Sequence, residues 1–244
     1  MIDSDKLTMK NCVCLAAAAL LSVQITSSAA EISGKVTLKG TPPPEKTIAF
    51  DDVCGKLHSG EVTTRHYLVG KDGGLANVFV YLKAGPAGKT YTPPEDGPVL
   101  DQVNCLYEPY VMGVMTNQKF KIRNSDSFMH NVHAIPKVAG NKEFNVGQPI
   151  KDQVSEKSFP SREVLVRFKC DVHAWMFAYV GVMDHPYFAV TDKEGTFKLP
   201  ADLPAGTYTV TAFHLKAGEA TQEVTVADGD KKTVDLTLEV KQAQ

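Results

Sequence analysis

The feature that most constrains this fold is an absence: after residue 30, no segment keeps a helical period for three turns. Short runs instead alternate apolar and polar residues and end at clusters of Gly, Pro, Asn or Asp. These runs cover residues 32–38, 62–69, 77–82, 110–115, 118–123, 130–135, 163–169, 220–226 and 233–240. The 244-residue chain is long enough for two modest domains or one large all-β domain. We therefore predict an all-β protein.

The run at residues 163–169 also predicts where the next side chain points. Val164, Val166 and Phe168 share one face of this strand, and Leu165 falls on the other face with the charged residues. Cys170 comes two residues after Phe168 and therefore falls on the same apolar face. We therefore expect its sulfur to point into the core.

Three side chains with metal-binding chemistry follow at three-residue spacings. Cys170 offers a thiolate, His173 an imidazole and Met176 a thioether. With one more His, these residues make up the ligand set of a blue-copper centre. The second imidazole must come from His130 or His133, which lie three apart on an extended segment and therefore point to opposite faces. Only one of them can enter the site, and the spacing by itself leaves the choice open.

Zinc is the rival metal, because one Cys and two His also suit a tetrahedral structural site. The thioether of Met176 favours copper, since Met is a soft ligand. A binuclear copper centre is disfavoured because it needs a second Cys in the ligand loop, where Cys170 stands alone.

The first 30 residues have the layout of a secretory signal. Lys6 and Lys10 precede an apolar run over residues 13–23, and small residues end at Ala30. We expect cleavage after Ala30 and a periplasmic or secreted protein. No second apolar run approaches the roughly 18 residues that a membrane span needs, so none is predicted.

The cysteines carry a second signal about compartment. Cys12 and Cys14 leave with the leader, and Cys54, Cys105 and Cys170 remain. An odd number of cysteines in an oxidising compartment needs an explanation. The simplest is a disulfide between Cys54 and Cys105, with Cys170 reserved for a metal; two free thiols are the alternative.

The net charge and the lack of catalytic motifs argue against nucleic-acid binding and against enzymatic activity. The net charge is -2 and stays so without the leader, which argues against a nucleic-acid partner. We find neither a Ser/His/Asp nor a paired-carboxylate arrangement, and no Gly-rich phosphate loop. We therefore expect no enzymatic activity.

Residues 99–184 resemble the cupredoxin family, in particular its amicyanin and plastocyanin branch. Residues 124–133 look like the first ligand loop of that family, and residues 170–176 look like the short ligand loop of amicyanins. The resemblance implies a Greek-key sandwich that holds one type 1 copper ion and carries single electrons between redox protein partners. His130, Cys170 and His173 would be the strong ligands and Met176 the weak axial one. Asn131 would tie the two ligand loops together and donate toward the thiolate.

The flanking segments resemble a second type of domain. The segments 32–36, 75–78, 195–197 and 203–208 are similar to the transthyretin-like, carboxypeptidase regulatory-type β-sandwich. Its two halves would be residues 31–90 and 186–244, with a cupredoxin-like domain over residues 91–185 inserted between them and the leader at residues 1–30. Insertion at an exposed loop is a tolerated arrangement.

The same family likeness suggests how electrons would leave the site. The ring edge of His173 would reach the surface. Trp175 would either be a core residue or form, with Phe128 and Met129, an apolar rim for a redox partner. Two other functions stay open from the sequence. One is an exported binding module for a glycan or an envelope protein, with a structural metal or none. The other is copper storage or delivery.

Overall fold

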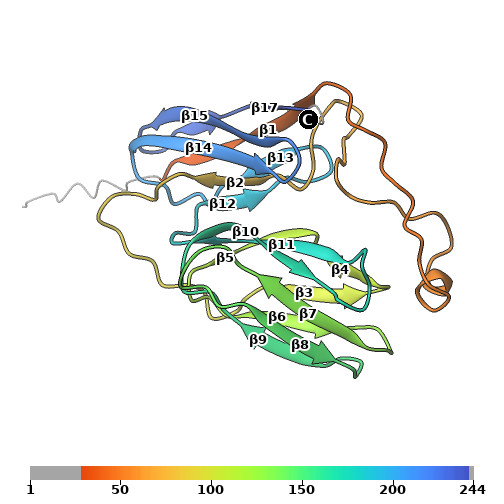
Figure 1. Ribbon diagram of the computed structural model, residues 1–244. Coiled ribbons are helices and arrows are strands. Elements are labelled where there is room, and N and C mark those ends of the chain that lie inside the picture. Colours follow the sequence, from red (N-terminus) through yellow and green to blue (C-terminus); the bar gives the residue numbers. More distant parts are fainter. Residues whose placement is uncertain (1–28, 242–244) are drawn as a thin grey trace, which may run out of the picture.

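The computed structural model describes residues 29–241, which are all-β apart from one short 3-10 helix, η1 (Cys54–Leu57). The strands build two sandwiches, which lie one above the other in Figure 1. The predicted fold class is confirmed. The predicted leader lies outside the described residues except for its last two positions. Among the described residues, no helix has the length and apolar character needed to cross a membrane.

The outer sandwich is the upper unit in Figure 1. Its first sheet has the order β13 (Thr196–Lys198), β1 (Glu31–Lys39), β16 (Lys231–Thr233), and β17 (Leu236–Glu239) also pairs with β1. Its second sheet has the order β12 (Phe188–Val190), β2 (Phe79–Leu82), β14 (Gly206–His214), β15 (Gly218–Val226). Ile32, Val80 and Val210 belong to the shared core, because alternate residues of each strand face inward. Ala30 is also buried and donates its N–H to the Leu203 carbonyl at 3.0 Å, so the sandwich begins one residue before the expected cleavage point.

The inner sandwich is the lower unit. Its larger sheet has the order β5 (Val111–Met115), β11 (Phe177–Met183), β10 (Glu163–Lys169), β7 (His130–Ile135), β8 (Phe144–Gln148). Its smaller sheet has the order β4 (Leu106–Glu108), β3 (Val99–Val103), β6 (Phe120–Asn124), β9 (Val154–Lys157). Phe120, Phe159 and Phe168 pack together between the sheets, with ring centroids 6.0 to 6.2 Å apart. Cys170 and Met176 belong to the same core.

The inner sandwich is inserted into the outer one. The chain leaves the outer sandwich after β2, builds β3 to β11, and returns with β12, which pairs with β2. Phe79 of β2 is central to the contact between the two units, where it belongs to one buried cluster with Tyr179 of β11. Gly181 of β11 makes room for it: a Cβ there would lie 2.3 Å from the Phe79 ring.

Two predictions about strands are wrong. Residues 62–69 form only isolated bridges, Thr63 with Thr47 and Val69 with Leu75, because no complete strand lies alongside them. Conversely, residues 136–160, for which no strand is predicted because the segment is polar and lacks a clear period, contain β8 and β9. Both are edge strands of their sheets, where one side is unpaired and polar residues are favoured.

A bulge in β10 changes the predicted assignment of side chains to its two faces. The register shifts between Glu163 and Val166, and Leu165 adopts a φ of 59°. As a result Leu165 packs into the cluster between the sandwiches and does not lie with the charged residues. Beyond the bulge the alternation resumes, and Cys170 is only 2% exposed, as the parity argument requires.

Candidate metal centre

Strand pairing in the larger inner sheet brings the proposed ligands to one end of it. β7 and β10 are antiparallel neighbours, with His133 opposite Lys169. The start of β7 therefore lies beside the end of β10. His130 is the first residue of β7, and Cys170 directly follows β10. His173 lies in the loop that joins β10 to β11, so all three side chains come from adjacent chain segments.

Three donor atoms converge at this end. The Nδ1 atoms of His130 and His173 are 2.9 Å apart. The Sγ of Cys170 lies 4.0 Å from the Nδ1 of His130 and 3.7 Å from that of His173. All three residues are buried and form a group whose ligand atoms lie within 4.8 Å of one another. Ligands at about 2 Å from a shared ion lie roughly 3 to 4 Å from one another, so this spacing fits one metal ion.

The ligand loop is closed by two backbone hydrogen bonds that also place Met176. The N–H of Met176 donates to the His173 carbonyl at 3.0 Å, and the N–H of Cys170 donates to the Met176 carbonyl at 3.2 Å. Met176 is fully buried in the core that contains Cys170. The loop thus turns tightly enough to return the thioether residue to the thiol.

Carboxylates lie behind both imidazoles. The Nε2 of His130 is 2.8 Å from the Oδ2 of Asp126, which fixes a proton on Nε2 and leaves Nδ1 free to bind a metal. On the other side, Asp51 lies with its Oδ2 3.7 Å from the Nε2 of His173. Both histidines are therefore oriented with Nδ1 toward the centre of the site.

The surroundings favour an ionised sulfur. Burial raises the pKa of Cys170, but hydrogen bonds with His130 and with the backbone of Asn131 and His173 outweigh it and lower the pKa below its ordinary value. Burial lowers the pKa of His130, but hydrogen bonds to Asp126 and Cys170 raise it overall. For His173, burial and the neighbouring His130 lower the pKa. Such residues bind metals as a thiolate and neutral imidazoles, so an ion here would displace the proton that the raised pKa of His130 favours.

Asn131 joins the two ligand loops. Its Oδ1 accepts hydrogen bonds from the Asp171 N–H at 2.7 Å, the Val172 N–H at 3.3 Å and the Cys170 thiol at 3.3 Å. Its Nδ2 donates to Asn145 and Asp171. In the structure the side-chain oxygen accepts from the thiol, while the backbone of Asn131 lowers the pKa of Cys170. The residue therefore fastens the loops together, and its side-chain amide accepts a hydrogen bond from the sulfur instead of donating one to it.

His133 lies outside the donor group. Its Nδ1 is 2.9 Å from Asp171 and its Nε2 is 2.6 Å from Glu143, so carboxylates occupy both ring nitrogens. Because β7 is extended, His130 and His133 point to opposite faces of the sheet, and only His130 faces the core.

The predicted pairing of Cys54 with Cys105 is confirmed. Cys54 and Cys105 form a disulfide with Cα atoms 5.8 Å apart, and Cys170 is a free, buried thiol. The disulfide lies directly beside the site, because both of its sulfurs and a ring nitrogen of His173 lie within 4.8 Å of one another.

The prediction that the ring edge of His173 reaches the surface is wrong, since this residue is 5% exposed. The segment around the disulfide covers it. Trp175 is half-buried, packs edge-on against Phe50 and donates its Nε1–H to the Cys105 carbonyl at 3.0 Å. Of the expected apolar rim, Met129 is 49% exposed, and Phe128 packs its ring against both ligand imidazoles.

Sequence reasoning missed Asp51, Asp126 and Tyr107. Asp126 stands in a cluster that indicates a turn, and turn residues are not normally read as partners of a ligand. Tyr107 is fully buried and donates its hydroxyl hydrogen to the carbonyls of Asn131 and Lys169, so it holds the backbone of both ligand segments. Tyr107 lies outside every strand predicted from the sequence, so nothing there marked it.

The donor set fits copper. One thiolate and two imidazoles bind either copper or zinc, but the fourth nearby residue, Met176, carries a soft thioether that suits copper. The donors are supplied by segments that are hydrogen-bonded to their neighbours, so they would hold an ion with little rearrangement.

Comparison with known proteins gives one family match. The profile of the carboxypeptidase regulatory-like domain matches residues 178–239, which covers the end of the inner sandwich and the second half of the outer one. No curated protein matches this chain.

Solved structures similar to this chain include copper proteins. A copper-containing nitrite reductase (NirK) from Thermus scotoductus SA-01 is 16% identical, with a TM-score of 0.34, and the match covers 42% of this chain and 25% of the reductase. A purple cupredoxin from Nitrosopumilus maritimus is 23% identical, with a TM-score of 0.30, over 36% of this chain and 99% of the cupredoxin. The Cu(I) form of an amicyanin mutant is 21% identical, with a TM-score of 0.31, over 42% of this chain and 97% of amicyanin.

Proposed function

We propose that this chain is an exported type 1 copper protein that carries single electrons between redox partners. The observation that carries the proposal is the convergence of Cys170 Sγ with the Nδ1 atoms of His130 and His173, beside the buried Met176. Copper bound there would supply one-electron chemistry between Cu(I) and Cu(II).

The site has the character of a carrier and not of a catalyst. A catalytic metal keeps one position for water or substrate. Here the donors are buried, and Phe128 and the disulfide segment pack over them. Such a site favours electron transfer through the protein over binding of a substrate.

Rigid donors support the same proposal. Asp126 fixes the ring of His130, and it is itself held by the N–H groups of Asn104 and Cys105 at 2.7 and 2.8 Å. Asn131 fixes the start of the ligand loop. Because His130 and the segment that carries Cys170 are held by further hydrogen bonds, their positions change little when the charge of a bound ion changes.

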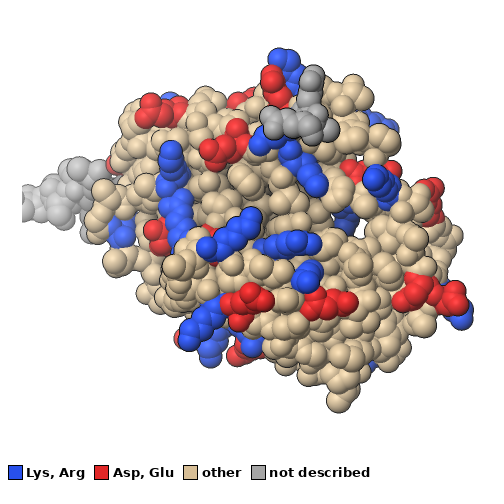
Figure 2. Space-filling model, viewed as in Figure 1, with Lys and Arg blue, Asp and Glu red and all other residues tan. Residues whose placement is uncertain are grey.

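The partner would be another redox protein that docks beside the exposed Met129. Basic and acidic side chains share the face of the molecule drawn in Figure 2, in keeping with the small net charge. The Cys54–Cys105 disulfide is in keeping with an oxidising compartment, which supports export.

The test is the spectrum of the copper-loaded, oxidised chain. We expect intense visible absorption from the thiolate-to-copper transition and the electron-spin resonance spectrum of a single type 1 ion. Cys170→Ser should abolish the visible band, whereas His133→Ala should keep it, because both ring nitrogens of His133 face carboxylates outside the donor group. Failure to bind copper, or binding without the intense band, would overturn the proposal.

A further inference from the structure

A long excursion of the outer sandwich, which we call the arm (residues 41–66), reaches the metal site. It leaves after β1 and returns before β2, and in Figure 1 it descends as the orange segment that ends at η1. Its two legs are joined by backbone hydrogen bonds from the Ile48 N–H to the Val62 carbonyl and from the Thr64 N–H to the Lys46 carbonyl, each 2.8 Å. The arm is thus a braced extension and not a loose loop.

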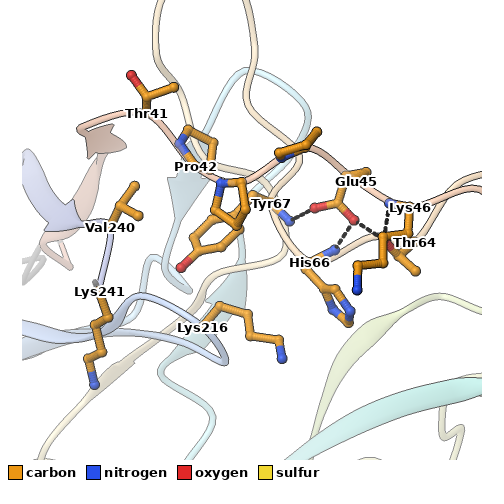
Figure 3. Close-up of a pocket in the computed structure, with 12 residues that line it drawn as sticks. Thr41, Pro42, Glu45, Lys46, Thr64, His66, Tyr67, Lys216, Val240 and Lys241 are labelled. Carbon is orange, nitrogen blue, oxygen red and sulfur yellow. Dashed lines mark hydrogen bonds between the residues drawn. The ribbon is translucent and has the colours of Figure 1, made fainter. Parts of the chain in front are cut away.

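The root of the arm is fixed by one carboxylate. Glu45 accepts hydrogen bonds from the N–H groups of His66 and Tyr67, at 2.9 and 2.6 Å, and from the hydroxyl of Thr64. Figure 3 shows these bonds beside a surface pocket of about 870 Å³ that lies between the arm and the end of the outer sandwich. This carboxylate therefore ties the two legs together where the arm meets the outer sandwich.

The tip of the arm, which we call the cap (residues 50–58), is fastened to the inner sandwich. Its Cys54 forms the disulfide with Cys105. Phe50 stacks on His58 with centroids 4.5 Å apart and packs edge-on against Trp175 at 5.3 Å. The Nε2 of His58 lies 2.9 Å from the Asn104 carbonyl.

The cap lies over one proposed ligand. Asp51 faces the Nε2 of His173 at 3.7 Å, and the disulfide sulfurs lie within 4.8 Å of a ring nitrogen of the same residue. His173 is consequently buried although it lies in a loop. The side of this imidazole that faces away from Cys170 is closed by the cap.

The disulfide also organises the carboxylates behind both ligand imidazoles. Asp51 accepts hydrogen bonds from the N–H groups of Val53 and Cys54, at 3.0 and 2.7 Å. Asp126, which faces His130, accepts a hydrogen bond from the N–H of Cys105 at 2.8 Å. Each cysteine of the bond therefore holds one carboxylate in place with its own amide.

We propose that the cap is a cover over His173 and that the Cys54–Cys105 bond is its latch. When the bond is intact, the imidazole is closed to solvent. A dithiol reductant would supply two electrons and two protons, becoming a disulfide itself, while Cys54 and Cys105 become thiols and the cap is released. Both cysteines are buried, so the reductant must reach them through local opening of the cap, which contains no strand.

The proposal rests on the proposed function in so far as it treats His173 as a ligand. Its test, however, uses metal-free full-length protein. Diethyl pyrocarbonate acylates exposed imidazoles, and mass spectrometry of peptides reports each histidine separately. His185 and His214 are buried outside the cap and serve as internal references. In the Cys54→Ser/Cys105→Ser variant, we expect His173 to react about tenfold faster than in the wild type, with both references unchanged, as local opening predicts.

A second measurement uses the wild-type chain treated with a phosphine that reduces disulfides. The modification rate of His173 should rise selectively in the same way, without any substitution. If this rate rises no more than the rates of the reference histidines in both experiments, the cap is not a latched cover. Because no copper is involved, this failure is distinct from failure of the proposed electron carrier, which the visible spectrum decides.

Discussion

The Nδ1 atoms of His130 and His173 lie 2.9 Å apart although 43 residues separate them in the chain. Two ring nitrogens at this distance must share one proton as donor and acceptor, or share a cation. The Nε2 atom of His130 already faces Asp126, so its Nδ1 is the atom left for a ligand. A metal ion bound between these rings would displace that proton, so its binding is expected to be weaker in acid.

The choice between the two histidines of β7 can be tested directly. His130→Ala removes a donor from the buried group, so we expect loss of the visible copper band. His133→Ala is the matched control, because its ring contacts Asp171 and Glu143 outside the site. It should retain the band. The absorption spectrum of each copper-treated variant checks this, and the opposite result would move the ligand to His133.

Asn131 should contribute strongly to stability as well as to the site. Asn131→Ala leaves the N–H of Asp171 without its partner near the buried thiol, which we expect to cost about 1 to 3 kcal/mol of unfolding free energy. Urea denaturation measures this cost. Asn145→Ala, which removes an exposed partner of Asn131 and of the Asp171 side chain, should cost less, and equal losses would contradict the role given to Asn131.

The contact between the sandwiches depends on the missing side chain at Gly181. A Cβ there would meet the Phe79 ring at 2.3 Å, so Gly181→Ala should lower the free energy of unfolding by about 1 to 3 kcal/mol. Gly60→Ala is the control, because a Cβ at that position meets nothing within 4 Å. Thermal or urea unfolding compares the two variants. Similar stabilities would show that the Phe79 ring moves aside at little cost in free energy.

His214 should make the protein less stable in mild acid. Burial lowers its pKa to about 4 from an ordinary value of 6.5, and its Nδ1 accepts a hydrogen bond from the Ala217 N–H. Below pH 6.5 the unfolded chain takes up this proton first, so the stability present above pH 6.5 is lost as the pH falls toward 4.

Titration of His214 should lower the free energy of unfolding by about 2 kcal/mol at pH 4.5. It should be missing from His214→Gln, which has no group that titrates there. Urea unfolding at pH 7 and pH 4.5 gives the difference for both proteins. Equal losses on acidification would show that other groups account for the pH dependence.

Local patterns in the chain were enough for the fold class and for the direction of one side chain. The alternation of Val166, Phe168 and Cys170 depends only on the period of a strand, and it survives the bulge at Leu165. The bulge itself has no such signal, because a register shift depends on what the neighbouring strand offers. The edge strands β8 and β9 were missed for the same reason: their pairing, and not their own pattern, makes them strands.

By itself, then, the sequence determined an all-β chain and one short loop in which Cys170, His173 and Met176 follow one another at a fixed spacing. The tertiary structure decided which histidine of β7 faces the thiol and which carboxylates stand behind the imidazoles. It also decided that residues from the arm close over His173. Spacing along one segment is set by local backbone geometry, whereas contacts between distant segments depend on how sheets pair and pack, which no local pattern records.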